Sequence, residues 1–253
     1  MELNGVGAIV TGGASGLGGA TAEMLARMDA KVTIFDLNEE AGEAHAAKIG
    51  GKFIKVNVVD DASVTDGIAA AEAAHGIARV LVNCAGVAIA MKTVGRETAP
   101  HPLDQFRKVV EINLIGTFNV ISKFAARLSL AEPIGEERGV IINTASVAAF
   151  EGQIGQAAYS ASKGGVAGMT LPIARDLSQF GIRVCTIAPG IFWTPMLGGL
   201  PQAAQDSLGK QVPFPSRLGR PEEYALLVQS IIANPMLNGE TIRLDGAIRM
   251  APR

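Results

Sequence analysis

Short apolar runs alternate with longer segments of helical periodicity along the whole chain. These runs have the character of strands, and most are apolar enough to be buried on both faces of a sheet. They are Gly7–Thr11, Lys31–Asp36, Lys52–Val56, Val80–Asn83, Gly139–Ala145, Arg183–Ala188 and Glu240–Leu244. Because strands that alternate with helices form parallel sheets, the pattern predicts an α/β fold with a doubly wound parallel sheet of about seven strands and helices on both faces.

Helical periodicity is clear in several of the intervening segments. After the first predicted strand, residues recur on one helix face at Leu17, Thr21, Met24, Leu25 and Met28. Longer helices are expected over Leu103–Leu130 and Ala157–Phe180. A last helix should follow Pro221, because proline suits the first helical position.

Three segments lack a regular pattern and are expected to be irregular: Ala88–Pro102, Ala131–Arg138 and Gly190–Gly219. The first and the third follow predicted strands. In an open α/β sheet the ligand crevice lies at the carboxyl ends of the strands. We therefore expect substrate contacts in these two segments, with residues 190–219 as the substrate loop.

The composition is that of a globular protein with a large core. Hydrophobic residues make up 48% of the 253 residues, and 22 Lys+Arg against 24 Asp+Glu give a formal net charge of −2. Such a balance argues against nucleic-acid binding by broad phosphate neutralisation. No linker or repeat divides the chain, so residues 1–253 are expected to form a single domain.

Neither metal chemistry nor a membrane segment is expected. Cys84 and Cys185 do not form a CxxC motif or a Cys/His cluster, which indicates no metal site and a reducing, cytoplasmic location. The longest charge-free stretch, Val184–Gln205, contains three prolines and three glycines and is expected to be a loop rather than a membrane span. The apolar run Val6–Val10 lacks the flanks of a signal peptide, so the mature protein is expected to begin near Met1.

A glycine-rich loop joins the first predicted strand to the first helix. Gly12, Gly16 and Gly18 form a Gly-x-x-x-Gly-x-Gly pattern, which permits a tight turn and lets backbone N–H groups approach a pyrophosphate. Packing alone also produces such turns. At the end of the second strand, the Asp36 carboxylate can accept hydrogen bonds from an adenosine ribose and would repel a 2′-phosphate, which favours NAD over NADP. The alternative for Asp36 is a helix N-cap or a solvated strand end.

A possible catalytic group lies in the second half of the chain. Tyr159 and Lys163 are four residues apart and share a helix face. A nearby ammonium lowers the pKa of a phenol from about 10 toward the range useful for acid/base catalysis. Ser146, at the end of the fifth strand, can orient a carbonyl or an alcohol. Taken alone, such a Tyr/Lys pair often arises by chance and is usually a surface contact.

These elements also occur together with Asn83-Cys84-Ala85-Gly86, Asn113 and Pro189-Gly190. In this order and at these spacings, the chain resembles the short-chain dehydrogenase/reductase family over essentially its whole length, which implies a Rossmann-type fold. Three further runs, Gly139–Gln153, Val212–Gly219 and Ile242–Met250, resemble a group within that family, the type 2 3-hydroxyacyl-CoA dehydrogenases.

The resemblance implies an NAD-dependent oxidoreductase that interconverts 3-hydroxyacyl-CoA and 3-ketoacyl-CoA by hydride transfer. One alternative is a related enzyme that acts on a hydroxysteroid or another secondary alcohol. A rival from another class is a non-catalytic NAD-binding scaffold or sensor, against which the complete set of Asn113, Ser146, Tyr159 and Lys163 argues. The resemblance also implies a homotetramer, built largely through the two long helices.

The family roles carry over to matching residues. Tyr159 is expected to be the general acid/base, and Lys163 to hold the nicotinamide ribose and lower the Tyr159 pKa. Ser146 should bind the substrate oxygen, and Asn113 should help to hold a proton-relay water. The implied cofactor-binding residues are Gly12, Ser15, Gly16, Leu17, Gly18, Asp36, Asn57, Val58, Asn83, Cys84, Ala85, Gly86, Tyr159, Lys163, Pro189, Phe192 and Thr194. Ser146, Gln153, Gln156 and Tyr159 are the implied substrate-binding residues, although backbone capping is an equal alternative for the two glutamines.

Two positions depart from the family pattern. Asn57 stands where the family commonly has Asp, although its amide oxygen can still accept a hydrogen bond from adenine. Trp193, the only tryptophan, either narrows the substrate pocket or shields the loop. The three histidines have no metal-ligand spacing and are expected to be surface residues: His45, His75 and His101.

Overall fold

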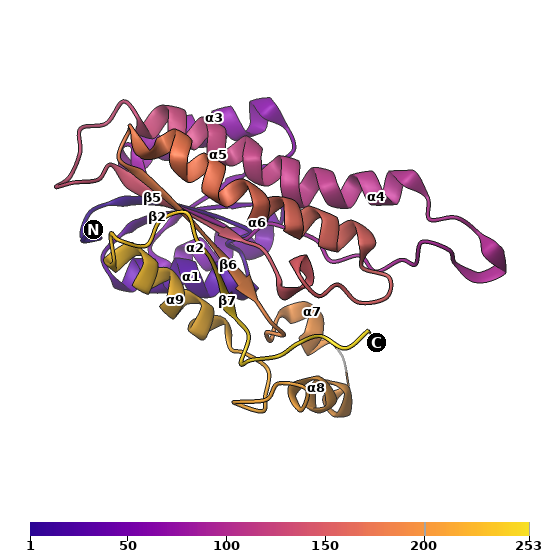
Figure 1. The fold of residues 1–253 in the computed structure, drawn as a ribbon. Helices are drawn as coiled ribbons and strands as arrows, with labels where there is room; N and C mark the ends of the chain where they lie inside the picture. Colours follow the sequence, from indigo (N-terminus) through magenta and orange to yellow (C-terminus); the bar gives the residue numbers. More distant parts are fainter. Residues whose placement is uncertain (200, 253) are drawn as a thin grey trace.

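The predicted strands form one seven-stranded sheet, with the order β3-β2-β1-β4-β5-β6-β7, in a computed structural model that describes residues 1–199 and 201–252 (Figure 1). All neighbouring strands pair in parallel. The strands are β1 (Gly7–Thr11), β2 (Lys31–Asp36), β3 (Lys52–Lys55), β4 (Ala78–Asn83), β5 (Gly139–Thr144), β6 (Ile182–Pro189) and β7 (Thr241–Leu244). Strands β2 and β3 follow β1 on one side of it, and β4 to β7 follow on the other side. The order of the strands therefore reverses between β1 and β4. Ligand sites of doubly wound sheets lie at such a switch point.

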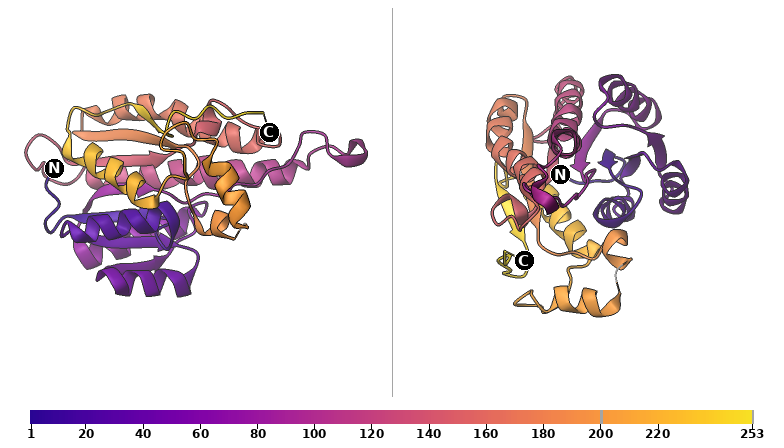
Figure 2. Two further views of the ribbon diagram at one scale, coloured as in Figure 1. Left: turned by 90° about the horizontal axis from the view of Figure 1, so that it is seen from below. Right: turned by 90° about the vertical axis from the view of Figure 1, so that its right-hand side faces the viewer.

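Helices cover both faces of the sheet, as expected (Figures 1 and 2). They are α1 (Gly16–Arg27), α2 (Glu39–Ile49), α3 (Asp61–His75), α4 (Leu103–Val110), α5 (Gly116–Leu128), α6 (Ala157–Ser178), α7 (Pro195–Gly198), α8 (Gln202–Gly209) and α9 (Pro221–Ala233). Helices α1, α2 and α9 lie on one face, and α3, α5 and α6 lie on the other. This is the doubly wound arrangement that the alternating pattern predicted.

Two hydrophobic cores lie on opposite faces of the sheet because successive strand residues point in opposite directions. Val10 and Val82 pack with α1 and α9, whereas Ile9 and Leu81 pack with α3 and α5. The central strands are therefore buried on both faces, which explains their continuous apolar sequences.

The expected long helix over Leu103–Leu130 is confirmed as one run from Leu103 to Leu128, but it contains a π-helical turn that was not predicted. A π-helical turn at Glu111–Ile115 separates α4 from α5, which ends at Leu128. The hydroxyl of Thr117, in the first turn of α5, donates to the Asn113 carbonyl, 2.8 Å away, and the Asn113 side chain accepts from the backbone after β4. Contacts to a distant part of the chain accompany the wider turn, so local periodicity does not reveal it.

The Leu103–Leu128 run is long and apolar enough to cross a membrane by length and composition, with a mean hydropathy of 1.3. Core helices of soluble proteins share these properties. In this structure Val120, Ile121 and Phe124 of α5 are buried beneath the sheet. The apolar character of this run is therefore partly explained by packing in the core.

The predicted substrate loop, residues 190–219, is less irregular than expected. It contains α7 and α8, and its residue 200 lies outside the described residues. Thr194 caps α7 by accepting a hydrogen bond from the Leu197 N–H at 3.4 Å, and Pro195 occupies the first turn. The Thr-Pro pair is a known helix start signal that the abundance of glycine and proline masked.

The Ala88–Pro102 segment projects away from the sheet beyond the start of α4 (Figures 1 and 2). An antiparallel bridge between Val94 and Pro100 and a short 3-10 turn at Arg96–Thr98 stiffen it. At its base, the Met91 N–H donates to the Gly155 carbonyl at 2.7 Å. This contact joins the projection to the loop that leads into α6.

Candidate active site

The glycine loop lies directly against the end of β4. Gly12 has a φ of +63°, and a Cβ at this position would lie 2.8 Å from the Ala85 nitrogen. Gly16 also has a positive φ, +57°. Ser15 occupies the N-cap of α1 without a side-chain cap hydrogen bond, and the first turn holds no acidic residue. The start of α1 therefore has the backbone geometry and the electrostatics that suit a pyrophosphate.

Asp36 is tied to the glycine loop across the switch point. Its carboxylate accepts hydrogen bonds from the Ala14 and Asn38 N–H groups, each at 3.1 Å. Asn38, not Asp36, caps α2, by accepting from the Ala41 N–H. The helix-cap alternative for Asp36 is therefore wrong, and its carboxylate lies beside the loop that would hold a dinucleotide.

The Asn57-Val58 pair offers fewer contacts than the family pattern implies. The Asn57 amide oxygen accepts a hydrogen bond from the Val59 N–H at 3.3 Å. Val58 is buried against Gly116, and its carbonyl accepts from the Asn119 side chain at 2.8 Å. The Val58 side chain and carbonyl are thus occupied within the protein.

The end of β4 contributes mainly backbone. The Asn83 side chain is buried and donates to the Asn143 side chain at 2.9 Å, so it does not point toward the crevice. The backbone N–H groups of Cys84 and Ala85 both donate to the Thr11 hydroxyl at 3.2 Å. Thr11, which is not among the predicted site residues, therefore fixes the backbone that faces the glycine loop.

Three predicted catalytic residues come together at the carboxyl end of β5. Ser146 follows this strand and accepts a hydrogen bond from the Ala148 N–H at 3.1 Å. Tyr159 and Lys163 lie on α6, with the Lys163 Nζ atom 6.0 Å from the centroid of the Tyr159 ring. Burial raises the pKa of Tyr159, while a hydrogen bond with Ser146 opposes this effect.

The expected lowering of the Tyr159 pKa by Lys163 is therefore not found. Lys163 donates instead to the Thr144 carbonyl, 2.7 Å from Nζ. Burial lowers the pKa of Lys163 from its ordinary 10.5 to about 8. At 6.0 Å from the centroid of the Tyr159 ring, the Lys163 ammonium does not offset the burial of the phenol.

Replacing Lys163 with methionine is expected to make the free energy of unfolding depend less on pH. The folded pKa of about 8 lies below 10.5, so the unfolded chain binds more protons between these values. The stability linked to Lys163 is present above the unfolded pKa and is lost as the pH falls through about 8, a difference of about 3 kcal/mol. Denaturant unfolding of both proteins from about pH 7 to 10.5 measures this difference. Parallel stability curves would contradict it.

Asn113 is placed beside Lys163 by the π-helical turn. Its side-chain oxygen accepts from the Val87 N–H at 2.8 Å, and its amide donates to the Val87 carbonyl and the Ser162 hydroxyl. Gly86 lies between the two residues, since a Cβ there would be 3.0 Å from Asn113 Oδ1 and 3.5 Å from Lys163 Nζ. The side chain of Asn113 is thus fully engaged within the protein, and its backbone carbonyl accepts from the Thr117 hydroxyl.

The two glutamines expected at the substrate site are engaged elsewhere. The Gln156 side chain accepts a hydrogen bond from the Gln153 N–H at 2.9 Å, which realises the capping alternative. The Gln153 amide donates to the Ala251 carbonyl, and the Ile154 N–H donates to the Pro252 carbonyl. These contacts hold the loop before α6 against residues near the C-terminus.

The residues after β6 divide between core and surface. Pro189 ends the strand, and the Phe192 side chain is buried against Gly219. The Thr194 hydroxyl caps α7. Trp193 is 43% exposed and lies over Gly198, where a Cβ would stand 3.0 Å from the indole ring. This position supports the shielding alternative for Trp193.

The three histidines, predicted as surface residues, are all partly exposed. His45 contacts the Gly19 carbonyl at 3.1 Å, and His101 packs edge-on against Phe106. Burial lowers the pKa of His75. Within residues 1–199 and 201–252, no group of three His, Cys, Asp or Glu side chains could hold a metal ion.

Comparisons with known proteins agree with this geometry. Residues 7–205 match the family described as short chain dehydrogenase. The chain is 56% identical to 3-hydroxyacyl-CoA dehydrogenase type-2 of Homo sapiens, over 99% of this chain and 98% of that protein. It is 54% identical to the protein of the same name from Drosophila melanogaster, over 96% and 97% of the two chains. The crystal structure of 3-hydroxyacyl-CoA dehydrogenase type-2 from Mycobacterium avium superposes with a TM-score of 0.95, at 42% identity, and covers 100% of this chain and 99% of that one.

Proposed function

This chain belongs to the short-chain dehydrogenase family and is therefore an oxidoreductase, and we propose that it uses NAD to interconvert 3-hydroxyacyl-CoA and 3-ketoacyl-CoA. The observation that carries the substrate class is the 56% identity over nearly the full length to a protein named for that activity. The gathering of Ser146, Tyr159 and Lys163 at one strand end supports turnover rather than a scaffold or sensor role.

The residues at the switch point fit a dinucleotide. Gly12 packs without a side chain against the end of β4, the uncapped start of α1 can bind the pyrophosphate, and Asp36 can accept hydrogen bonds from the adenosine ribose. When bound, the nicotinamide supplies or accepts the hydride. The protein itself contributes orientation and the movement of a proton.

In the proposed mechanism, Ser146 and Tyr159 hold the oxygen of the substrate. In the reducing direction the Tyr159 hydroxyl donates its proton to the carbonyl oxygen, and in the oxidising direction the phenolate accepts the proton of the alcohol. Because burial raises the pKa of Tyr159, the phenol keeps its proton at neutral pH and is suited to donation. Lys163 provides a nearby positive charge when it is protonated.

Substituting Asp36 with alanine is expected to weaken NADH binding by about 10- to 100-fold, because hydrogen bonds to a charged group are lost. NADPH binding should change less or improve, because the carboxylate that repels the 2′-phosphate is gone. Fluorescence titration with both nucleotides measures the two dissociation constants. Asn38→Ala is the matched control, since it removes the cap of α2 but keeps the carboxylate. Equal losses for both nucleotides would contradict the ribose role and indicate damage to the glycine loop.

The proposed substrate is tested by the initial rate of NADH oxidation with acetoacetyl-CoA, beside NADPH and beside a ketosteroid. Turnover with NADH and the CoA ester supports the proposal. Turnover with the ketosteroid alone favours the hydroxysteroid alternative. No turnover with any substrate, despite NADH binding, favours the scaffold or sensor.

We also propose a cytoplasmic homotetramer in which α5 and α6 meet their counterparts. Ile115 and Phe118 next to or on α5, and Leu171 on α6, are large apolar side chains that are about half exposed. Gly168 on α6 has open space where a Cβ would lie, which allows close helix approach. Light scattering tests the assembly, and a monomer at working concentration would refute it.

A further inference from the structure

A buried tyrosine from α9 reaches the catalytic end of β5. Tyr224 is completely buried, and its hydroxyl oxygen lies 2.7 Å from the Thr144 hydroxyl oxygen. The Thr144 hydroxyl also lies 2.6 Å from the Asn83 carbonyl. The Cys84 sulfur lies 3.7 Å from the Tyr224 oxygen. Four residues from three separate parts of the chain therefore meet directly behind the catalytic group.

The direction of these hydrogen bonds follows from the chemistry of the groups. A carbonyl only accepts, so Thr144 must donate its single hydroxyl proton to the Asn83 carbonyl. Tyr224 must then donate to the Thr144 oxygen, and the Cys84 thiol donates to the Tyr224 oxygen. The Tyr224 hydroxyl, on α9, is thus the donor that holds the Thr144 side chain in place.

Thr144 links the Tyr224 hydroxyl to Lys163 through two hydrogen bonds. The Thr144 carbonyl accepts the hydrogen bond from Lys163 Nζ at 2.7 Å, while its hydroxyl receives the Tyr224 proton. The titratable groups that face Lys163 in the described part of the chain are Tyr159 on its own helix and Cys84 after β4. The position of the Thr144 backbone therefore sets where the lysine ammonium stands relative to the Tyr159 phenol.

The same tyrosine is also linked to the substrate loop. The preceding residue, Glu223, pairs with Arg217 through two hydrogen bonds of 2.9 and 2.7 Å, and it accepts from the Arg220 N–H at 2.8 Å. Arg217 lies within residues 190–219. The first turn of α9 thus connects the substrate loop on one side with the support of Lys163 on the other.

We propose that Tyr224 is a positioning residue for the proton-transfer step. By its hydrogen bond to the Thr144 hydroxyl, it fixes the Thr144 carbonyl that accepts the hydrogen bond from Lys163. The inference depends on the proposed function only for the identity of the reaction. It assigns to α9, which contributes no group to the reacting atoms, a role in holding the catalytic lysine.

The test compares Tyr224→Phe, which removes one hydroxyl, with the wild-type enzyme in NADH-dependent reduction of acetoacetyl-CoA. We expect kcat to fall about tenfold, with KM for both reactants within about twofold, and the pH profile of kcat to shift. Thr144→Val should reproduce this loss and Thr144→Ser should largely restore wild-type behaviour. The double variant Tyr224→Phe/Thr144→Val should be no worse than either single variant, because both remove the same contact.

A matched control is the buried hydroxyl pair of Thr170 on α6 and Thr186 on β6, whose oxygens lie 2.6 Å apart. Thr170→Val should change stability but not the pH profile. If Tyr224→Phe behaves like Thr170→Val, or if its loss appears only in thermal stability, the proposal is overturned.

A second measurement needs no substrate and separates this proposal from the proposed function. The side-chain NMR signal of Lys163 in lysine-labelled protein, identified by its loss in Lys163→Met, reports the protonation of this residue. In Tyr224→Phe we expect its midpoint to fall by about half a pH unit or more, since a weaker carbonyl contact favours the neutral amine. An unchanged midpoint would refute the positioning role, whichever substrate the wild-type enzyme accepts. Absence of wild-type turnover would refute the proposed function alone.

Discussion

Tyr159→Phe is expected to reduce kcat by about 10³-fold while NADH binding stays within about twofold of wild type. The substitution removes the hydroxyl that would transfer the proton and keeps the ring that packs against the site. Because Ser146 and Lys163 remain in place, substrate and cofactor can still bind, so the loss should appear in kcat. Steady-state rates of acetoacetyl-CoA reduction and a fluorescence titration with NADH measure the two quantities.

Tyr224→Phe provides a matched comparison, because the chain has only two tyrosines. Both substitutions remove a tyrosine hydroxyl oxygen, but Tyr224 contacts Lys163 only through Thr144. The expected loss of kcat in Tyr224→Phe is therefore only about tenfold. Wild-type turnover by Tyr159→Phe would exclude the phenol as the acid/base. Loss of NADH binding in that variant would instead indicate that the hydroxyl has a structural role.

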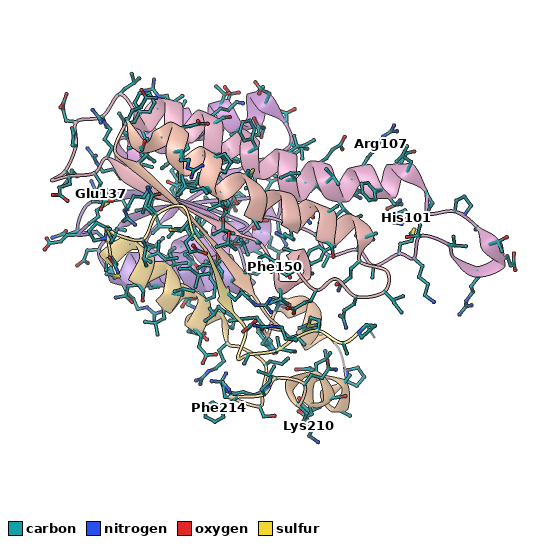
Figure 3. The ribbon with its side chains drawn as sticks, in the orientation of Figure 1. His101, Arg107, Glu137, Phe150, Lys210 and Phe214 are labelled. Atoms are coloured by element: carbon teal, nitrogen blue, oxygen red, sulfur yellow. The ribbon has the colours of Figure 1, made fainter. Side chains whose placement is uncertain are left out.

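Arg183→Met is expected to lower the free energy of unfolding by about 3 to 5 kcal/mol, because it leaves a buried carboxylate without its main partner. Arg183 and Glu137 are both less than a tenth exposed and lie 2.7 Å apart. The guanidinium also donates to carbonyls at the end of α9, including those of Ile231 and Ile232. Figure 3 places Glu137 at the end of the molecule away from Phe150, which follows the catalytic strand β5. Denaturant unfolding measures the loss, and kcat of the folded enzyme should be nearly unchanged.

The exposed pair of Arg127 and Glu72 is the control for this prediction. Arg127 donates to both Glu72 oxygens, at 3.1 and 2.8 Å, but the Arg127 side chain is half exposed. Arg127→Met should therefore cost far less stability than Arg183→Met. In Arg183→Met/Glu137→Leu, part of the stability should return, because the buried carboxylate that lost the guanidinium is gone. The return should be incomplete, because the buried Met1 ammonium, 3.3 Å from Glu137 in the wild type, then loses its carboxylate partner. Equal effects of the two arginine substitutions would contradict the argument from burial.

The strands and the layers of this protein could be predicted because burial on both faces imposes continuous apolar sequences. The ends of all seven strands lie within two residues of the predicted bounds. The π-helical turn at Glu111–Ile115 could not be predicted in this way, because it accompanies hydrogen bonds between Asn113 and Val87, 26 positions apart. The Thr194-Pro195 pair is a local signal for the start of helix α7, but the surrounding glycines and prolines favoured the prediction of an irregular loop.

In the candidate site, too, the local motifs could be predicted and the contacts between distant residues could not. Tyr159 and Lys163 share a helix face at any helix position, and Ser146 follows a strand, so their sequence spacing already indicated a common site. Their pKa values depend on which groups surround them, and here burial raises the pKa of Tyr159 and lowers that of Lys163. The partners responsible come from other elements and have no fixed spacing from the motif.

The sequence by itself determined the parallel sheet, the glycine loop beside Asp36 and the presence of Ser146, Tyr159 and Lys163, because each depends on local periodicity or on a motif of a few residues. Only the tertiary structure decided that Asn83 and Gln156 bond within the protein and that Tyr224 supports Thr144. The contacts of Asn83 with Asn143 and of Tyr224 with Thr144 join positions 60 and 80 apart in the chain. Their existence depends on how strands and helices pack, and packing follows from the whole set of buried surfaces rather than from any one segment.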